Sequence, residues 1–261
     1  MTSLAADHAL LVSAVREAGA LAHSFFRRGP KTWKKAAGDP VSEADIAVDV
    51  LLRERLHAPR PDYGWLSEES EDDPVRLDHN RVWIVDPIDG TRAFLEERPE
   101  FTVVAALVEN GRPLLGAVFN PATDEFFDAV KGGGARCNGE TIRVSDRGDF
   151  DDARLLASAR MVKRTIEGMS TRPATYDAVN SVAYRMALVA CGRYDATLSL
   201  GPKSDWDIAA ADLVVTEAGG LSTDASGARF VYNGATPRHP SLAVANPALH
   251  ARLLEVVESL D

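Results

Sequence analysis

At 261 residues and a formal net charge of −10 at pH 7, the chain is long enough for a large core and distinctly acidic. Hydrophobic residues make up 45% and charged residues 26%, which is typical of a globular protein and excludes a disordered one. The acidic charge argues against general binding to nucleic acid or to an anionic membrane, since both need a basic surface. We therefore expect neither a nucleic-acid polymer nor a membrane as a partner.

Cysteine usage and hydropathy bear on the compartment. Cys137 and Cys191 lie far apart and show no metal-binding spacing, which favours free thiols in a reducing cytoplasm. No stretch is long and apolar enough to span a membrane, and charged residues interrupt the apolar start of the chain. We predict a cytoplasmic protein without a signal peptide.

The N-terminal part of the chain predicts two helices separated by a basic segment. Apolar residues at helical spacing indicate an amphipathic helix over residues 4–26. The polar and basic residues 31–39 predict a mobile surface loop. Ser42 then begins a second helix that runs to about Leu56, and Asp45 is placed as the acid of a capping box.

Two predicted strands end in acidic residues. Residues 63–67 form a short apolar strand, and Glu68 follows it directly. The β-branched and aromatic residues 81–85 predict a buried strand that stops at Asp86, because Pro87 has no N–H for a ladder. If the two strands are neighbours, their carboxylates lie together on one edge of a sheet.

The residues after this second strand combine two kinds of binding group. Asp86 and Asp89 crowd together, and Gly90 and Thr91 then allow a tight turn and a helix start. Clustered carboxylates attract hard divalent cations, whereas the free N–H groups of a helix start attract phosphate. A solvated turn is the simpler interpretation of either acid alone. The whole stretch instead predicts metal-assisted phosphate chemistry.

The rest of the chain predicts a meander followed by alternating strands and helices. Turn signals such as Asn110-Gly111 predict an antiparallel meander of strands at 101–108, 114–119, 125–130 and 141–144. A polar boundary at 146–152 separates an N-terminal α+β half, residues 1–148, from a C-terminal α/β half, residues 149–261, within one compact catalytic unit. In the second half we expect strands at 154–158, 194–200, 221–223 and 241–245. We also expect helices at 176–190, at 206–220 with a glycine stop, and at 247–260.

Asp207 lies in the first turn of the helix predicted at 206–220. An acid there stabilises the helix dipole, which is the simplest reason for its presence. Its position beside Trp206, at a junction between loop and helix, also lets the carboxylate point into a shared cleft. Asp212 and Glu217, further along the same helix, lack this context.

Three separate blocks resemble the inositol monophosphatase-like superfamily of magnesium-dependent, lithium-sensitive phosphatases. They are residues 65–70, residues 83–91, and residues 206–220; a weaker fourth block is residues 39–45. Their order and spacing match the superfamily across nearly the whole chain. The resemblance implies a layered αβαβα sandwich of the type shared by inositol monophosphatases and fructose-1,6-bisphosphatases.

The resemblance also implies a role for each acid. Two Mg²⁺ ions are expected, with a possible third ion near Glu68. The first would bind Glu68, Asp86 and the backbone carbonyl of Ile88. The second would bind Asp86, Asp89 and Asp207.

The remaining implied roles concern the phosphate and the attacking water. The N–H groups of Gly90 and Thr91 would receive phosphate oxygens. Thr91 and Asp45 would orient and deprotonate the water, so that Glu68, Thr91 and Asp45 form the implied catalytic set. We expect Mg²⁺ and substrate to help order the loop at residues 31–39.

Residues before Trp206 favour one substrate class within this superfamily. Residues 201–207 look like the corresponding segment of bacterial 3′(2′),5′-bisphosphate nucleotidases, which hydrolyse 3′-phosphoadenosine 5′-phosphate. Leu200 stands where inositol monophosphatases often place an acid. A second phosphate would favour cations. The candidate substrate contacts, each of which could equally be an ordinary surface or cap residue, are Ser158, Arg160, Arg185 and Lys203.

Alternatives to a bisphosphate nucleotidase remain. The chain could be an inositol-1-monophosphatase, or a phosphatase of another small sugar or alcohol phosphate such as histidinol phosphate. It could also be an inactive metal-binding regulatory homologue, although no ligand of the implied set is missing. Haloacid-dehalogenase-like chemistry through a covalent aspartyl phosphate is disfavoured, because two residues rather than one separate Asp86 from Asp89. The expected partner is a small phosphate ester, and a homodimer is possible.

Overall fold

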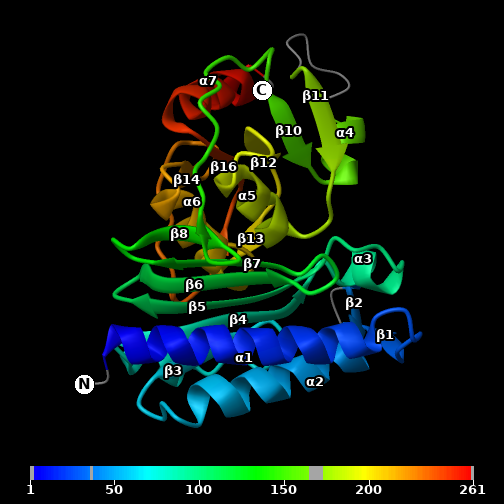
Figure 1. Cartoon of the computed structure of the whole chain (residues 1–261), viewed down its shortest axis with the longest axis vertical. Helices are drawn as coiled ribbons and strands as arrows, with labels where there is room; N and C mark the ends of the chain where they lie inside the picture. Colours follow the sequence, from blue (N-terminus) through cyan, green and yellow to red (C-terminus); the bar gives the residue numbers. More distant parts are fainter. Residues whose placement is uncertain (1–2, 36–37, 165–172, 260–261) are drawn as a thin grey trace.

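The computed structural model describes residues 3–35, 38–164 and 173–259, and arranges them as alternating helix and sheet layers (Figure 1). Two helices cover the outer face of a seven-stranded sheet, two lie between that sheet and a five-stranded sheet, and one covers the far side of the second sheet. In this order the helices are α1 (Leu4–Phe25) and α2 (Glu43–Leu52), α5 (Val182–Ala190) and α6 (Asp205–Glu217), and α7 (Pro247–Glu258). The predicted αβαβα sandwich is confirmed.

The seven-stranded sheet contains the predicted meander. Its first two strands are parallel and the others antiparallel. In spatial order the strands are β3 (Gly64–Ser67), β4 (Arg81–Asp89), β5 (Thr102–Glu109), β6 (Arg112–Asn120), β7 (Glu125–Val130), β8 (Gly134–Cys137) and β9 (Glu140–Thr141). The strand expected at 141–144 is wrong beyond Thr141, because the ladder with β8 ends there.

Both faces of this sheet are buried, as the side chains of β4 show. Val82 and Ile84 face the core shared with α5 and α6, whereas Trp83 and Val85 face the core shared with α1 and α2. Successive side chains of a strand point to opposite faces, so an uninterrupted apolar run is what a sheet covered on both sides requires.

Strand β4 does not stop at Asp86, contrary to the prediction from Pro87. It continues to Asp89 through an irregularity in its pairing with β5, where Asp86 pairs with Val104 and Asp89 with Thr102. A bulge leaves its extra residues out of the ladder, so the missing N–H of Pro87 does no harm there.

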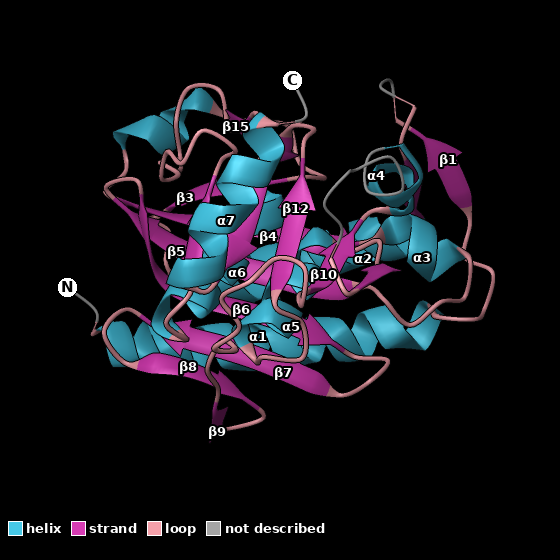
Figure 2. Ribbon diagram, turned by 90° about the horizontal axis from the view of Figure 1, so that it is seen from above, coloured by secondary structure: helices cyan, strands magenta, loops and turns pink. Residues whose placement is uncertain are grey.

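The five-stranded sheet belongs to the second part of the chain. Its strands, in spatial order, are β11 (Thr175–Ala178), β10 (Arg154–Ala157), β12 (Ala196–Ser199), β16 (Leu242–Ala245) and β14 (Leu221–Thr223). Helix α7 packs against it through Leu249 and Leu253, and lies over it in the view from above (Figure 2). Because the two sheets share no strand, the division at residues 148/149 falls between them, although the division into halves itself stays a prediction.

The helix predicted at 176–190 is wrong over its first residues. Residues 175–178 form β11, which pairs in parallel with β10, and Ser181 caps a shorter helix α5. The pattern of apolar residues could not reveal this pairing, because β10 lies about 20 residues earlier in the sequence.

The basic segment 31–39 is not a plain loop. Strand β1 (Thr32–Lys34) pairs with β2 (Pro40–Ser42) in a hairpin, while residues 36–37 lie outside the described part. Both views place β1 on the same side of the molecule as the short helices α3 (Thr91–Leu95) and α4 (Ala159–Arg164) (Figures 1 and 2). That metal or substrate orders this hairpin stays a prediction.

Shorter elements complete the description. They are a π-helical turn at Arg53–His57, a 3₁₀ turn at Pro74–Asp78, and the paired strands β13 (Lys203–Ser204) and β15 (Arg238–His239). Among the helices of the described ranges, none combines the length and the hydropathy that crossing a bilayer requires.

Gly116 allows helix α6 to approach strand β6. A Cβ atom at this position would lie 2.5 Å from the carbonyl oxygen of Ala210. We expect Gly116→Ala to destabilise the protein by about 2 kcal/mol, since backbone atoms must move to relieve the overlap. Chemical denaturation measures this, with Gly148→Ala as the matched control because its nearest neighbour would be 3.8 Å away. Equal stability of the two variants would contradict the prediction.

Candidate active site

Parallel pairing of β3 with β4 brings Glu68 and Asp86 to one edge of the sheet. Ser67 pairs with Val85, and the N–H of Glu68 donates to the carbonyl of Val85 at 3.3 Å. Glu68 and Asp86 are therefore the residues that directly follow the paired residues Ser67 and Val85, so they lie next to each other on neighbouring strands. The expectation that two neighbouring strands deliver their carboxylates together is met.

Asp89 is held by the start of helix α5. Its Oδ2 atom accepts hydrogen bonds from the hydroxyl of Ser181 and the N–H of Ala183, both at 2.6 Å. The carboxylate thus complements the positive end of the helix dipole. This contact connects the two parts of the chain through an implied metal ligand.

Gly90 makes the turn from β4 into α3. Its φ of 97° is left-handed, and a Cβ atom there would lie 2.8 Å from the carbonyl oxygen of Glu100. Only glycine combines that conformation with that close approach. The N–H groups of Gly90 and Thr91 consequently begin a helix beside the acids, as the sequence predicts.

Asp45 belongs both to a helix cap and to the site. Its Oδ2 accepts from the N–H of Ser42 at 2.8 Å and from the Ser42 hydroxyl at 2.6 Å. Its Oδ1 lies 3.1 Å from the Thr91 hydroxyl, which also lies 3.0 Å from the carbonyl of Ile88. Asp45 therefore caps α2 and is also hydrogen-bonded to Thr91, while its catalytic role stays a prediction.

Asp207 enters the site from the first turn of α6. The N–H of Ser204 donates to its Oδ2 at 2.8 Å. The fully buried Asp205 fixes this turn, since it accepts from the N–H of Asn233 at 2.6 Å and lies 2.8 Å from Nε2 of His239. The sequence offered no signal for this anchoring role of Asp205.

Burial raises the pKa values of the acids in the site, and neighbouring negative charges add to the shifts of Asp86 and Asp207. Burial, followed by the charges of Glu68, Asp89 and Asp207, holds the pKa of Asp86 well above its usual range. Burial also raises the pKa of Asp89, and burial with the charge of Asp89 raises that of Asp207 to about 7. Such a group of carboxylates is costly to ionise without a cation nearby.

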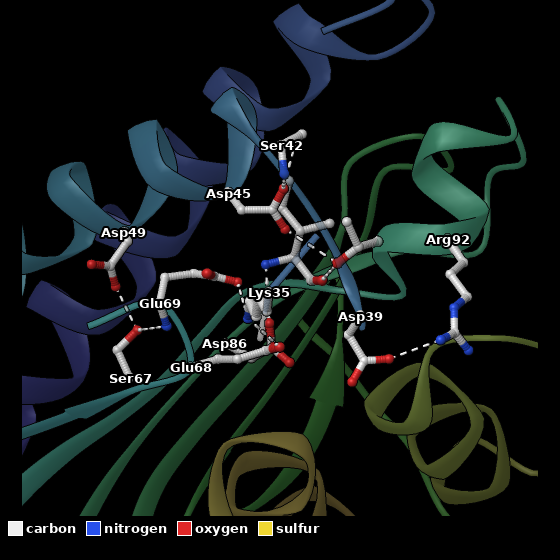
Figure 3. Close-up of polar contacts among 12 residues, drawn as sticks. Lys35, Asp39, Ser42, Asp45, Asp49, Ser67, Glu68, Glu69, Asp86 and Arg92 are labelled. Atoms are coloured by element: carbon white, nitrogen blue, oxygen red, sulfur yellow. Dashed lines mark hydrogen bonds and ion pairs between the residues drawn. The ribbon is translucent and has the colours of Figure 1, made fainter. Parts of the chain in front are cut away.

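Lys35 supplies one such cation. Its Nζ atom lies 2.7 Å from an oxygen of Glu68 and 2.7 Å from an oxygen of Glu69 (Figure 3). Burial opposes its charge, but Glu68 and Glu69 outweigh burial and raise the pKa of Lys35. Sequence reasoning missed this residue, because a lysine in a basic segment looks like an ordinary surface residue.

The donor set suits a hard divalent cation. The implied ligands are carboxylate oxygens and one backbone carbonyl, which are the donors that Mg²⁺ prefers. Across the described ranges, no group of three or more His, Cys, Asp or Glu side chains is already arranged to hold a metal ion. Glu68 in particular is engaged with Lys35, and would have to exchange that partner for a metal.

A cavity of about 680 Å³ is lined in part by Lys203, whose charge interacts with those of Asp207 and Asp89. Its described lining residues include no acid and are Ser158, Arg160, Met161, Ser199, Leu200, Gly201, Pro202 and Lys203. Three of the four predicted substrate contacts therefore share one cavity. The fourth, Arg185, does not line it and is buried on α5 with 1% exposure.

The raised pKa of Asp207 predicts how pH affects stability. In the unfolded chain its pKa is near 4, whereas in the fold it is about 7. Between these values the folded state binds the extra proton, so the ionised carboxylate increasingly destabilises the fold as pH rises. In EDTA, the free energy of unfolding of Asp207→Asn should increase relative to that of wild type by roughly 2 kcal/mol as the pH rises from about 5 to about 8.

Thermal unfolding of both proteins at several pH values measures this difference. Excess Mg²⁺ should abolish it at the upper pH, because a bound cation stabilises the wild-type carboxylate. Asp207→Asn losing stability relative to wild type as pH rises would contradict the assignment.

Comparison with known proteins identifies the family. The model of the inositol monophosphatase family matches residues 5–261. The chain belongs to the inositol monophosphatase family. An inositol-1-monophosphatase of Rhizobium meliloti is 35% identical over 266 residues, with 95% of each chain covered. A Nus factor SuhB of Xylella fastidiosa is 34% identical, with 84% of this chain and 82% of that protein covered.

Solved structures agree with the family assignment. An inositol monophosphatase structure from Thermotoga maritima has a TM-score of 0.84 and 31% identity, with 95% of both chains covered. A SuhB structure from Bartonella henselae has a TM-score of 0.86 and 29% identity, with 95% of this chain and 97% of that chain covered. As a member of the inositol monophosphatase family, the chain is a metal-dependent phosphoric monoester hydrolase.

Proposed function

We propose that the protein is a Mg²⁺-dependent phosphatase whose first candidate substrate is an inositol monophosphate. The observation that carries the chemistry is the convergence of Asp86, Asp89 and Asp207 beside the bonded pair Thr91–Asp45. The substrate class follows the names of relatives such as the Rhizobium meliloti enzyme. We therefore place the inositol monophosphatase function above the bisphosphate nucleotidase function, although the sequence interpretation gave it only as the alternative.

The metal ligands are those implied by the family resemblance. Glu68, Asp86 and the carbonyl of Ile88 would hold one Mg²⁺, and Asp86, Asp89 and Asp207 a second, with room for a third beside Glu68. When bound, Mg²⁺ would stabilise charge on the phosphoryl group and acidify the attacking water. Lys35 would release Glu68 as metal enters, so the β1–β2 hairpin would shift on binding.

The protein's own groups position the reactants. The N–H groups of Gly90 and Thr91 would hold phosphate oxygens at the start of α3. The Thr91 hydroxyl would orient the attacking water, and Asp45 would take up the proton through it. Burial raises the pKa of Asp45, which suits a group that accepts a proton.

A bisphosphate nucleotidase is the second candidate. It is favoured by the cavity of about 680 Å³, where Arg160 and Lys203 are the charged lining residues and Leu200 occupies the position of a family acid. A second phosphate would be attracted by these cations, whereas a polyol would gain less from them. Arg185 is assigned to substrate only under this candidate, and would have to become accessible first.

The deciding experiment is phosphate release from a panel of substrates with Mg²⁺, with and without Li⁺. The panel contains inositol 1-phosphate, 3′-phosphoadenosine 5′-phosphate, fructose 1,6-bisphosphate and histidinol phosphate. We expect inositol 1-phosphate to give the highest kcat/KM and Li⁺ to inhibit. A dominant adenosine bisphosphate would establish the second candidate, and absence of turnover on the whole panel would favour a regulatory homologue.

Two further properties complete the proposal. A cytoplasmic location agrees with the unpaired thiols of Cys137 and Cys191, both free in the structure. A homodimer is proposed on the resemblance alone, and sedimentation analysis tests it.

A further inference from the structure

Arg185 is buried in an arrangement that is unusual for a guanidinium. The side chain is 1% exposed, and its Nε and Nη1 atoms have no hydrogen-bond partner among the described residues. A buried cation without hydrogen bonds is strongly destabilising unless a nearby charge compensates it. The reason for the burial must therefore lie in the charges around Arg185.

The geometry of helix α5 directs Arg185 toward the acids. Arg185 lies one turn after Ser181, and its N–H donates to the Ser181 carbonyl at 3.3 Å. Helical side chains lean toward the helix N-terminus, where Ser181 and Ala183 bind the carboxylate of Asp89. The charges of Asp89 and Asp207 partly offset the burial that lowers the pKa of Arg185 to about 10.

The two parts of the acid cluster thus have different counter-charges. Glu68 is paired with Lys35, whose side chain is 26% exposed on a hairpin and can be displaced. Asp89 and Asp207 face Arg185, which is enclosed in the core between the sheets together with its neighbours Tyr184 and Met186. A cation entering beside Glu68 can replace Lys35, but a cation entering beside Asp89 must coexist with Arg185.

We propose that Arg185 is a permanent counter-charge to the Asp89–Asp207 pair and weakens the binding of the second Mg²⁺. This inference rests on the proposed metal site. Arg185 acts here as a positioning residue, because its field acts through the two carboxylates and it need not touch substrate.

Direct measurement of Mg²⁺ binding tests this proposal without relying on turnover. Isothermal titration of metal-free protein near pH 8 is compared for wild type, Arg185→Met, Arg185→Gln and Arg185→Lys. Removing the charge should tighten the weaker binding event by about tenfold or more and leave the tighter event within about threefold. Arg185→Lys keeps the charge and should resemble wild type. Arg112→Met, which removes a cation at the start of β6, should change neither event.

The outcomes separate this inference from the proposed function. Wild type that binds no Mg²⁺ would overturn the metal site itself. Wild type that binds two ions, with Met and Gln variants of unchanged affinity, would overturn the role of Arg185 alone. If both neutral variants fail to fold, the side-chain NMR signal of Arg185 in the wild-type protein is followed instead. This signal is assigned by its absence from the spectrum of Arg185→Lys. It should shift on filling the weaker site, and its constancy from metal-free to saturated protein would refute the proposal.

Discussion

Asp207→Asn is expected to lower kcat/KM by about a thousandfold or more while leaving the protein folded. The substitution removes the negative charge that would hold the second Mg²⁺. The amide oxygen can still accept from the N–H of Ser204, so the cap of α6 survives. Loss of a carboxylate whose pKa is already raised to about 7 should also make the metal-free protein more stable at neutral pH.

The combination of these two effects is the diagnostic result. Steady-state kinetics at saturating Mg²⁺ and thermal unfolding in EDTA are measured on the same preparation. Asp212→Asn is the matched control, because Asp212 is an acid of the same helix that bonds to Tyr232 instead of entering the site. Normal turnover by Asp207→Asn at saturating Mg²⁺ would remove Asp207 from the site.

Thr91→Val should lower kcat by about a hundredfold to a thousandfold with little change in KM. Valine keeps the shape of threonine but lacks the hydroxyl that lies 3.1 Å from Asp45 and 3.0 Å from the carbonyl of Ile88. The attacking water would then lose its orientation and its route for the proton. Binding of the phosphate would persist, since it relies on backbone N–H groups.

Thr91→Ser is the control, because it restores a hydroxyl and should recover most of the activity. Comparing the two variants separates the effect of the hydroxyl on activity from the effect of methyl-group packing. Equal losses in Val and Ser variants would assign the effect to packing, and wild-type kcat in Thr91→Val would exclude Thr91 from water activation.

The elements that could be predicted from the sequence depend on local signals. The gathering of Glu68 with Asp86 follows from two apolar strands that lead into acids, whereas the layered fold was implied by the resemblance to the family. The tight turn at Gly90 follows from the residue itself, since its φ of 97° is accessible chiefly to glycine. The local sequence predicts Asp45 as a helix cap, and the resemblance implies that it is a site residue. Its carboxylate accepts hydrogen bonds from Ser42 of the cap and from Thr91 of the site.

The features that could not be predicted depend on contacts between distant segments. Strand β11 forms because β10 offers it a parallel partner. Lys35 reaches Glu68 across 33 positions of sequence, and Ser181 reaches Asp89 across 92. Pro87 misled the strand assignment, because a bulge in a buried strand tolerates a missing N–H. No local pattern encodes any of these pairings.

The anchoring of the acids has a consequence for how this enzyme could change its specificity. Asp45 caps α2, Asp89 holds the start of α5, and Asp207 caps α6, so altering any of them disturbs a helix as well as the chemistry. The segments around Ser158 and Leu200 line the cavity instead, and there the Ser158 hydroxyl accepts from the N–H of Met161 at the start of the short helix α4. If this cavity receives the leaving group, as proposed, substitutions in those segments would change substrate preference while leaving Asp45, Asp89 and Asp207 in place.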